Sequence, residues 1–270
     1  MQGAGEVIVQ RERHPRANMN VPFPRKLPSG ITLVELLAVI VVLAVLIAIL
    51  IPTISGVVNQ KGNFSHASHA RQIAQAYQTY SLDQPHPRNI STTASSPGGT
   101  ALTGTASNIE DVALILAKYA KLNDGAAWFI RTDKNLADAY IPRAVFAGDI
   151  TQAKSVTVDF QKTSPKAWAF VVGLTTSPPQ ASMMPLLWTY GLKSDGTWLR
   201  NSPWDGTGGH IAYLDGHVEW AERISLENGG VSFAVYSGGD QGKPTVDYRQ
   251  AINSHAENPC QVVNADGRGN

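Results

Sequence analysis

Cysteine is almost absent from this sequence, since Cys260 is the only one among 270 residues. A single cysteine excludes an intramolecular disulfide and a thiolate metal cluster. Excess charge is absent too, because 22 basic residues face 21 acidic ones and leave a net charge of +1. Such a balance gives no field that would attract nucleic acid, and we expect no nucleic-acid partner.

Motifs of the common enzyme classes are also missing. There is no nucleophile elbow and no His-Glu-x-x-His zinc motif, and the GTGG stretch at 206–209 precedes a predicted strand instead of a helix. A phosphate-binding loop requires that helix, so we do not expect an enzyme. One alternative stays open, a membrane-tethered periplasmic hydrolase that uses His210 or His217.

The main feature that is present is an apolar run of sixteen residues at 36–51. As a helix over 31–51 it would be about 31 Å long, close to the ~30 Å hydrocarbon core of a bilayer. Residues 1–30 carry five Lys or Arg against two Glu, a local net charge of +3. The positive-inside rule then predicts a single-pass protein whose amino terminus is cytoplasmic and whose carboxyl-terminal part lies outside the cytoplasm.

Other kinds of apolar segment fit less well. A cleavable secretory signal has a shorter apolar stretch, of about 7 to 15 residues, and a small-residue cleavage site. A plain signal anchor fits the length of the run. Neither explains Glu35, because a carboxylate among apolar residues is unfavourable in a bilayer unless it has a partner.

The stretch KLPSGITLVELLAVIVVLAVLIAILIP resembles the amino-terminal signature of type IV prepilins and type II secretion pseudopilins. A basic leader ends in Gly30, Glu35 is the fifth residue after it, and Pro52 is the twenty-second. Two features depart from the pattern. Ile31 stands where phenylalanine is commoner, and the leader is long, although a start at Met19 would shorten it to 12 residues.

The resemblance implies a processing and assembly pathway. A prepilin peptidase would cleave after Gly30 and methylate the new amino group of Ile31. Glu35 of a neighbouring subunit would pair with that amino group and set the register of assembly. Pro52 would mark the end of a segment that is often extended in assembled filaments, or would only kink the helix.

The function implied is that of a structural subunit of a type IV pilus-like or type II secretion pseudopilus filament. Its partners would be the peptidase, other pilin or pseudopilin subunits and the inner-membrane assembly platform. It would reside in the inner membrane before joining the filament. A minor pilin that acts as an adhesin or DNA-uptake tip is the alternative. The sequence does not separate a major from a minor subunit, or secretion from motility or adhesion.

The expected fold is α+β and pilin-like, with a long N-terminal α-helix, half transmembrane and half amphipathic, packed on an antiparallel β-sheet. We divide the chain into a leader at 1–30, a transmembrane and assembly helix at 31–58, a globular head at 59–236 and a polar tail at 237–270. Apolar positions recur at helical spacing over 59–82, and Asn108 is expected to cap a helix over 109–122. Candidate strands lie at 128–131, 155–160, 167–174, 185–190 and 231–236.

The sharpest local pattern in the head is GGHIAYLDGHVEW. Asp215 and Gly216 predict a two-residue type I′ turn that closes a hairpin. In that register Ile211 faces Trp220, and Ala212 faces Glu219. The segment also resembles the Asp-Gly-His-Val stretch near the carboxyl terminus of many prepilin-type proteins, which supports the family and the fold but no activity.

Metal-ligand residue types occur in the hairpin, but their alternation separates them. His217 and Glu219 share a strand face, His210 begins the partner strand, and Asp215 is used by the turn, so we expect no metal site and no cofactor. Calcium stays an alternative, because Asp195 and Asp205 lie in glycine-containing loops. We do not expect His66 and His69 to bind a metal ion, and we expect them to be solvated or at the edge of a buried face.

Overall fold

The computed structural model describes residues 32–82, 89–91, 104–136, 139–149, 154–174, 180–227, 230–236, 238–252, 260–265 and 267, with the backbone alone for 47–64. The chain divides into two compact units, 1–53 and 54–270. Every described strand belongs to the second unit.

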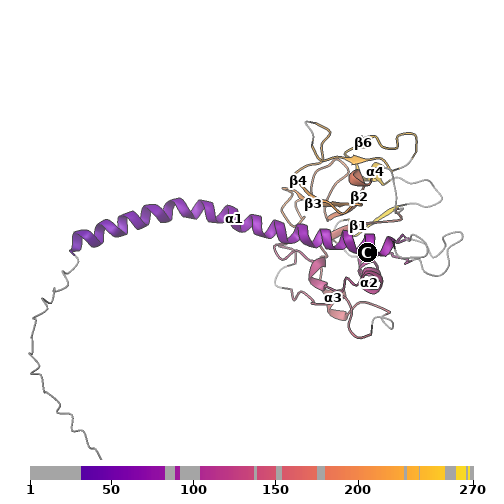
Figure 1. Cartoon of the computed structure of the whole chain (residues 1–270), viewed down its shortest axis with the longest axis horizontal. Helices are drawn as coiled ribbons and strands as arrows, with labels where there is room; N and C mark the ends of the chain where they lie inside the picture. The colour runs from indigo at the N-terminus through magenta and orange to yellow at the C-terminus, as the bar shows by residue number, and fades with distance from the viewer. Residues whose placement is uncertain are drawn as a thin grey trace, which may run out of the picture. The chain divides into compact units, whose positions relative to one another are not determined.

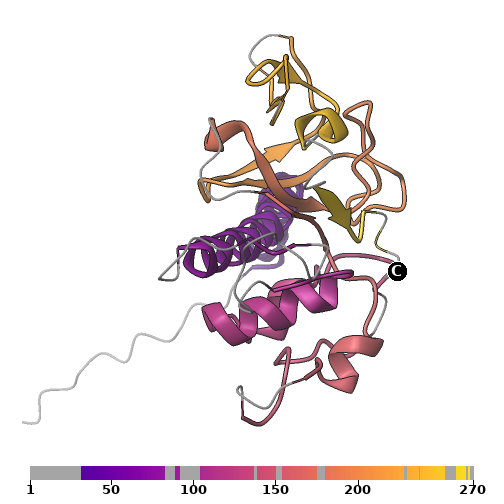
Figure 2. The same ribbon diagram turned by 90° about the vertical axis from the view of Figure 1, so that its right-hand side faces the viewer.

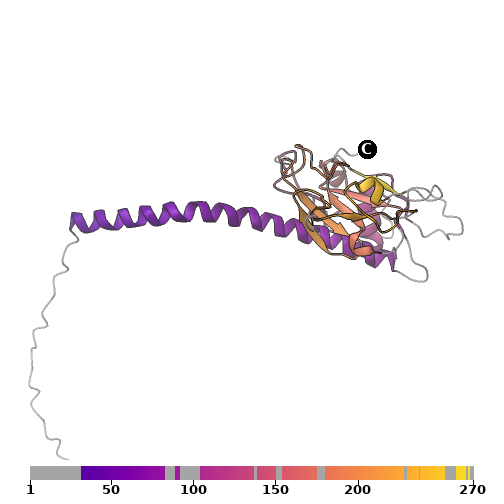
Figure 3. The same ribbon diagram turned by 90° about the horizontal axis from the view of Figure 1, so that it is seen from above.

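Helix α1 (Leu33–Ser81) contributes to both units and is uninterrupted over its 49 residues (Figures 1 and 3). Its carboxyl-terminal part agrees with the amphipathic pattern predicted for 59–82. The buried side chains there recur at intervals of three and four residues, which places them on one face of the helix: Ala70, Ile73, Ala74, Tyr77 and Tyr80.

The predicted pilin-like fold with a transmembrane half is wrong. Among the residues that the structure describes, no helix is both long and apolar enough to cross a membrane. The described apolar side chains at the start of α1 extend from Leu33 to Leu46. What the described residues form is a mixed fold of helices and antiparallel strands.

The main sheet of the second unit is antiparallel throughout. Its spatial order is β4 (Val218–Ala221), β3 (Gly209–Tyr213), β2 (Pro185–Thr189), β1 (Trp168–Val172) and β7 (Gln261–Val263). Strands β1, β2 and β3 are buried at every position. Both faces of these three strands are therefore covered, unlike the common antiparallel sheet with one solvated face.

Helices cover the two faces of this sheet (Figures 1 and 2). On one side lie α2 (Ile109–Ala120) and the carboxyl-terminal part of α1. The ring of Tyr77 in α1 packs edge-to-face against the ring of Phe170 in β1, with the ring centroids 5.6 Å apart. On the other side, α4 (Tyr248–Ala251) places Tyr248 5.1 Å from Trp188 of β2. A small sheet of β5 (Phe233–Ala234) and β6 (Pro244–Thr245) lies beside α4. Aromatic side chains thus fill both layers of the core.

Several predicted elements agree with the structure. Asn108 caps α2 by accepting a hydrogen bond from the backbone N–H of Asp111 at 2.8 Å, and the predicted strands at 167–174 and 185–190 contain β1 and β2. The segment at 237–270, predicted as a polar tail, contributes β6, α4 and β7.

Two predicted strands are wrong. Residues 125–128 form a short 3₁₀ helix, η1 (Gly125–Trp128), in place of the start of the strand predicted for 128–131. The strand predicted for 155–160 is replaced by helix α3 (Val158–Lys162), because the hydroxyl of Thr157 accepts a hydrogen bond from the N–H of Phe160 and caps that helix. A second short 3₁₀ helix, η2 (Ala181–Met183), precedes β2.

The predicted type I′ turn at Asp215 and Gly216 is also wrong. That turn needs positive φ at both residues, but only Gly216 has it, at +88°. The N–H of Gly216 bonds to the carbonyl of Tyr213 at 2.9 Å, and the N–H of Tyr213 bonds to the carbonyl of His217 at 3.0 Å. This is a three-residue loop that ends in a left-handed glycine.

The longer loop shifts the hairpin register by one residue. Ile211 now faces Glu219, and Trp220 faces His210. The predicted pairs of Ile211 with Trp220 and of Ala212 with Glu219 do not form. His210 and Trp220 therefore lie on the same face of the hairpin.

Gly216 should be sensitive to substitution. A Cβ atom at this position would lie 3.2 Å from Nε2 of Gln78 in α1, and Gln78 itself donates to the carbonyl of Leu214 at 2.8 Å. We expect Gly216→Ala to lower the free energy of unfolding by about 1 to 2 kcal/mol, because the left-handed conformation strains alanine. Urea unfolding of the full chain measures this loss. Gly239→Ala is the control, since a Cβ there meets nothing within 4 Å, and equal losses for both variants would contradict the assignment.

Candidate functional site

The residues predicted for processing lie outside the described part of the chain. These residues are Gly30 and Ile31. Pro52 lies within α1, whose backbone is helical on both sides of it, and its side chain belongs to the part described by backbone alone. Of the predicted assembly residues, Glu35 alone can be described at the level of its side chain.

Glu35 forms a reciprocal cap with Thr32 at the start of α1. Its Oε2 atom accepts hydrogen bonds from the backbone N–H and from the hydroxyl of Thr32, both at 2.9 Å. In return, the hydroxyl of Thr32 accepts from the backbone N–H of Glu35 at 3.2 Å. This is a capping box, in which an N-cap Thr and a Glu three residues later satisfy each other's backbone donors. Glu35 therefore has a local role that the sequence interpretation missed.

The first turns of α1 carry an apolar surface that surrounds the helix. We call this set the apolar surface of α1, and its members are 50% to 79% exposed: Leu33, Val34, Leu36, Leu37, Val39, Ile40, Val41, Val42, Leu43, Val45 and Leu46. Glu35 is the only charged residue between its ends. A helix that is apolar all round is ordinarily buried, and the described residues do not cover this surface.

A cluster of histidine and tryptophan rings lies in the second unit, where α1 meets the β3–β4 hairpin. Trp204 is at its centre, with ring centroids 5.9 Å from His66, 5.3 Å from His210 and 5.0 Å from Trp220. His66 is 5% exposed, so the expectation that it would be solvated or at a face edge is wrong. Burial first, and then the neighbouring His69 and His210, lower the pKa of His66 to about 4. His66 is thus a neutral core residue at pH 7.

The other polar residues of the hairpin lie apart from this cluster. The His217 ring stacks on Tyr213 at 4.3 Å, and its Nδ1 atom lies 2.5 Å from Oδ1 of Asp215. His210 and His217 therefore have separate surroundings. Within the described ranges, no group of three or more His, Cys, Asp or Glu side chains is placed to hold a metal ion.

The aspartates considered for calcium have lysine partners. Asp195 contacts Nζ of Lys193 at 2.9 Å and accepts hydrogen bonds from the backbone N–H and the hydroxyl of Thr197. These hydrogen bonds lower the pKa of Asp195, and the bond from the Thr197 hydroxyl has the largest effect. Asp205 contacts Nζ of Lys134. Each carboxylate is thus paired in a different loop.

Comparison with known proteins gives no further assignment. A scan against protein-family models and searches of curated proteins and of solved structures find no match to this chain.

Proposed function

We propose that this chain is a structural subunit of a type IV pilus-like or type II secretion pseudopilus filament, processed after Gly30 and assembled through the start of α1. The observation that carries the proposal is the apolar surface of α1, which is exposed on all sides of the helix. In a filament, the equivalent helices of neighbouring subunits would cover it. The prepilin-like signature around Gly30, Glu35 and Pro52 supports the same interpretation.

The energetic case rests on the amount of apolar surface. Full burial of one Val, Leu or Ile side chain contributes about 1.5 to 3 kcal/mol. Eleven such side chains in this surface are at least half exposed. Lateral packing of several helices would bury most of that area, and this gain is large compared with the cost of ordering two subunits.

Glu35 gives the assembly its specificity. Surrounded by apolar helices, its carboxylate would need a cationic partner, because a buried unpaired charge costs about 3 to 5 kcal/mol. The amino group of Ile31, newly formed on a neighbouring subunit, is the partner that we propose. Any test must therefore distinguish the loss of the hydrogen bonds with Thr32 from the loss of the Glu35 charge.

Two substitutions make that separation. Glu35→Gln keeps the capping box, which accepts Gln as well as Glu, but removes the charge, whereas Glu35→Ala removes both. We expect both variants to lose incorporation into filaments by tenfold or more, while cleavage after Gly30 continues. The measurement is co-purification of tagged with untagged subunits, together with the mass of the mature amino terminus.

Two results would overturn the proposal. If Glu35→Gln is incorporated like the wild type and only Glu35→Ala fails, Glu35 acts as a helix cap and not as a charge partner. If the mature chain keeps its leader or begins near residue 57, as after ordinary signal-peptide cleavage, the filament function itself is wrong. The inner-membrane location stays a prediction, which fractionation of cells expressing the tagged chain would test.

A further inference from the structure

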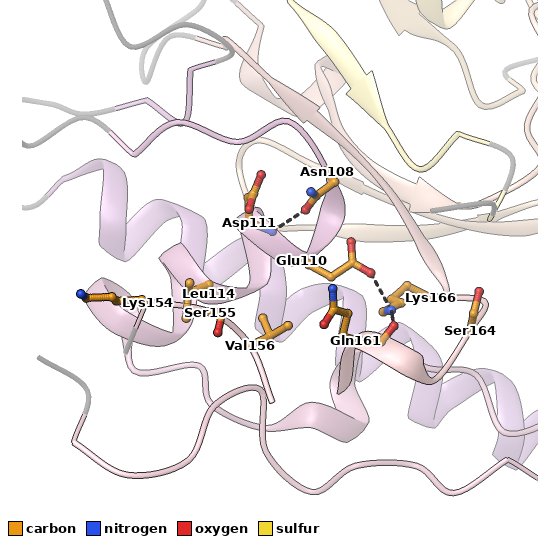
Figure 4. Close-up of a pocket in the computed structure, with 10 residues that line it drawn as sticks. All are labelled: Asn108, Glu110, Asp111, Leu114, Lys154, Ser155, Val156, Gln161, Ser164 and Lys166. Carbon is orange, nitrogen blue, oxygen red and sulfur yellow. Dashed lines mark hydrogen bonds and ion pairs between the residues drawn. The ribbon is translucent and has the colours of Figure 1, made fainter. Parts of the chain in front are cut away.

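A pocket of about 420 Å³ opens in the second unit beside the start of α2 (Figure 4). Its walls come from the first turns of α2, from residues 154–156, from α3, and from the segment that leads into β1. Its size falls within the range of small-ligand sites, about 300 to 1,000 Å³.

The charges around this pocket are balanced and largely used by the protein itself. Lys166 is 3% exposed; its ammonium pairs with Glu110 at 2.6 Å and donates to the backbone carbonyl of Gln161 at 3.1 Å. Asp111 accepts two hydrogen bonds from Ser107. Lys154 points away from the other labelled side chains in Figure 4. The buried ammonium of Lys166 and the carboxylate of Glu110 are therefore already paired with each other, and the Asp111 carboxylate is hydrogen-bonded within the protein.

Several neutral groups of the lining are left for a ligand. In the described part of the chain, the side-chain amide of Gln161 and the hydroxyls of Ser155 and Ser164 have no protein partner, and Asn108 uses only its amide oxygen, as the cap of α2. Amides and hydroxyls both donate and accept hydrogen bonds. Leu114 and Val156 add a small apolar patch to the same lining.

We propose that this pocket binds an N-acetylated sugar, either free or as a unit of a glycan. The hydroxyls of such a ligand donate and accept, as the neutral groups of the pocket require. Its acetamido group matches the amides of Asn108 and Gln161, and its methyl group matches the patch of Leu114 and Val156. Anions are disfavoured by Glu110 and Asp111. This inference is independent of filament assembly, since the pocket and the apolar surface of α1 share no residue.

The test uses the purified full chain in a detergent without a sugar head group. The probes are N-acetylglucosamine and its linear tetramer, with glucosamine, glycine and inorganic phosphate as competitors of other charge. Saturation-transfer difference NMR and titration calorimetry measure binding. We expect saturable binding of N-acetylglucosamine, and tighter binding of the tetramer if the source is a glycan. Glucosamine should bind at least tenfold more weakly, because it lacks the acetyl group.

Variants assign the binding to the pocket. Gln161→Met keeps the length of the side chain but removes its amide, and we expect it to weaken binding about tenfold, which corresponds to 1.4 kcal/mol. Ser155→Ala should weaken binding in the same direction. Gln75→Met makes the same change on an exposed position of α1 and should leave affinity unchanged. No saturable binding of either sugar, equal binding by Gln161→Met and the wild type, or preferential binding of glycine or phosphate would each overturn the proposal.

Discussion

Replacing Glu110 by alanine is expected to lower the free energy of unfolding by about 3 kcal/mol, at the lower end of the range for breaking a buried ion pair. The reason is the state in which the variant leaves Lys166. The Lys166 side chain is 3% exposed, and its ammonium loses the carboxylate partner that lies 2.6 Å away. The carbonyl of Gln161 at 3.1 Å and the ring of Phe160 at 5.4 Å remain as weaker contacts. Because Glu110 is 18% exposed, water can enter the gap and limit the loss.

A double variant tests whether the loss of stability comes from the unpaired charge of Lys166. Glu110→Ala combined with Lys166→Met removes both charges, and we expect it to recover more than half of the lost stability, since methionine keeps the apolar stem without the buried charge. Urea unfolding followed by near-UV circular dichroism measures all variants. Glu222→Ala removes an exposed carboxylate and serves as the control, with an expected change within about 0.5 kcal/mol. A loss no larger than this control for Glu110→Ala would show that the pair contributes little.

The features that local rules predicted well depend on few neighbours. Asn108 followed by two acidic residues is a helix start, and α2 begins at Ile109 as expected. Thr32 and Glu35 form a second such start, and their spacing of three residues is a signal that could have shown the capping box from sequence alone. The sequence interpretation assigned Glu35 to assembly only and missed this local role.

The errors arose where two local structures compete. Residues 155–160 contain β-branched side chains that favour a strand, but Thr157 is also a good helix cap, and the packing of Phe160 in the core favours α3. In the hairpin, Asp-Gly fits both a two-residue and a three-residue loop. In the structure the three-residue loop forms, and its Leu214 carbonyl accepts a hydrogen bond from Gln78 of α1. The one additional loop residue changes every cross-strand pair of the hairpin.

Neither the pocket nor the ring cluster could be predicted, because both join distant parts of the chain. The pair of Glu110 and Lys166 connects α2 with the segment before β1. The ring cluster brings His66 of α1 to Trp204 in a loop and to His210 of β3. No periodicity in the sequence encodes such contacts, since they depend on how α1 packs on the sheet.

Acidification from pH 7 to pH 5 is expected to lower the free energy of unfolding by about 2 kcal/mol through His66 alone. In the folded chain the pKa of His66 is about 4, whereas an unfolded histidine has its ordinary value near 6.5. Between these values the unfolded chain binds the proton and the folded chain does not. Stability is therefore complete above about pH 6.5 and is lost as the pH falls toward 4. Burial also lowers the pKa of His69, which adds loss in the same direction.

The variant His66→Phe tests this assignment. Phenylalanine keeps a ring next to Trp204 but cannot bind a proton, so the loss of stability between pH 7 and pH 5 should shrink by about 2 kcal/mol relative to the wild type. His217→Phe removes a histidine that is stacked on Tyr213 outside the cluster. This variant should keep the full loss of stability between pH 7 and pH 5, because His66 remains. Urea unfolding at a series of pH values gives the slopes. If the slopes of His66→Phe and the wild type coincide, His66 is protonated equally in both states and the ring cluster does not exclude its charge.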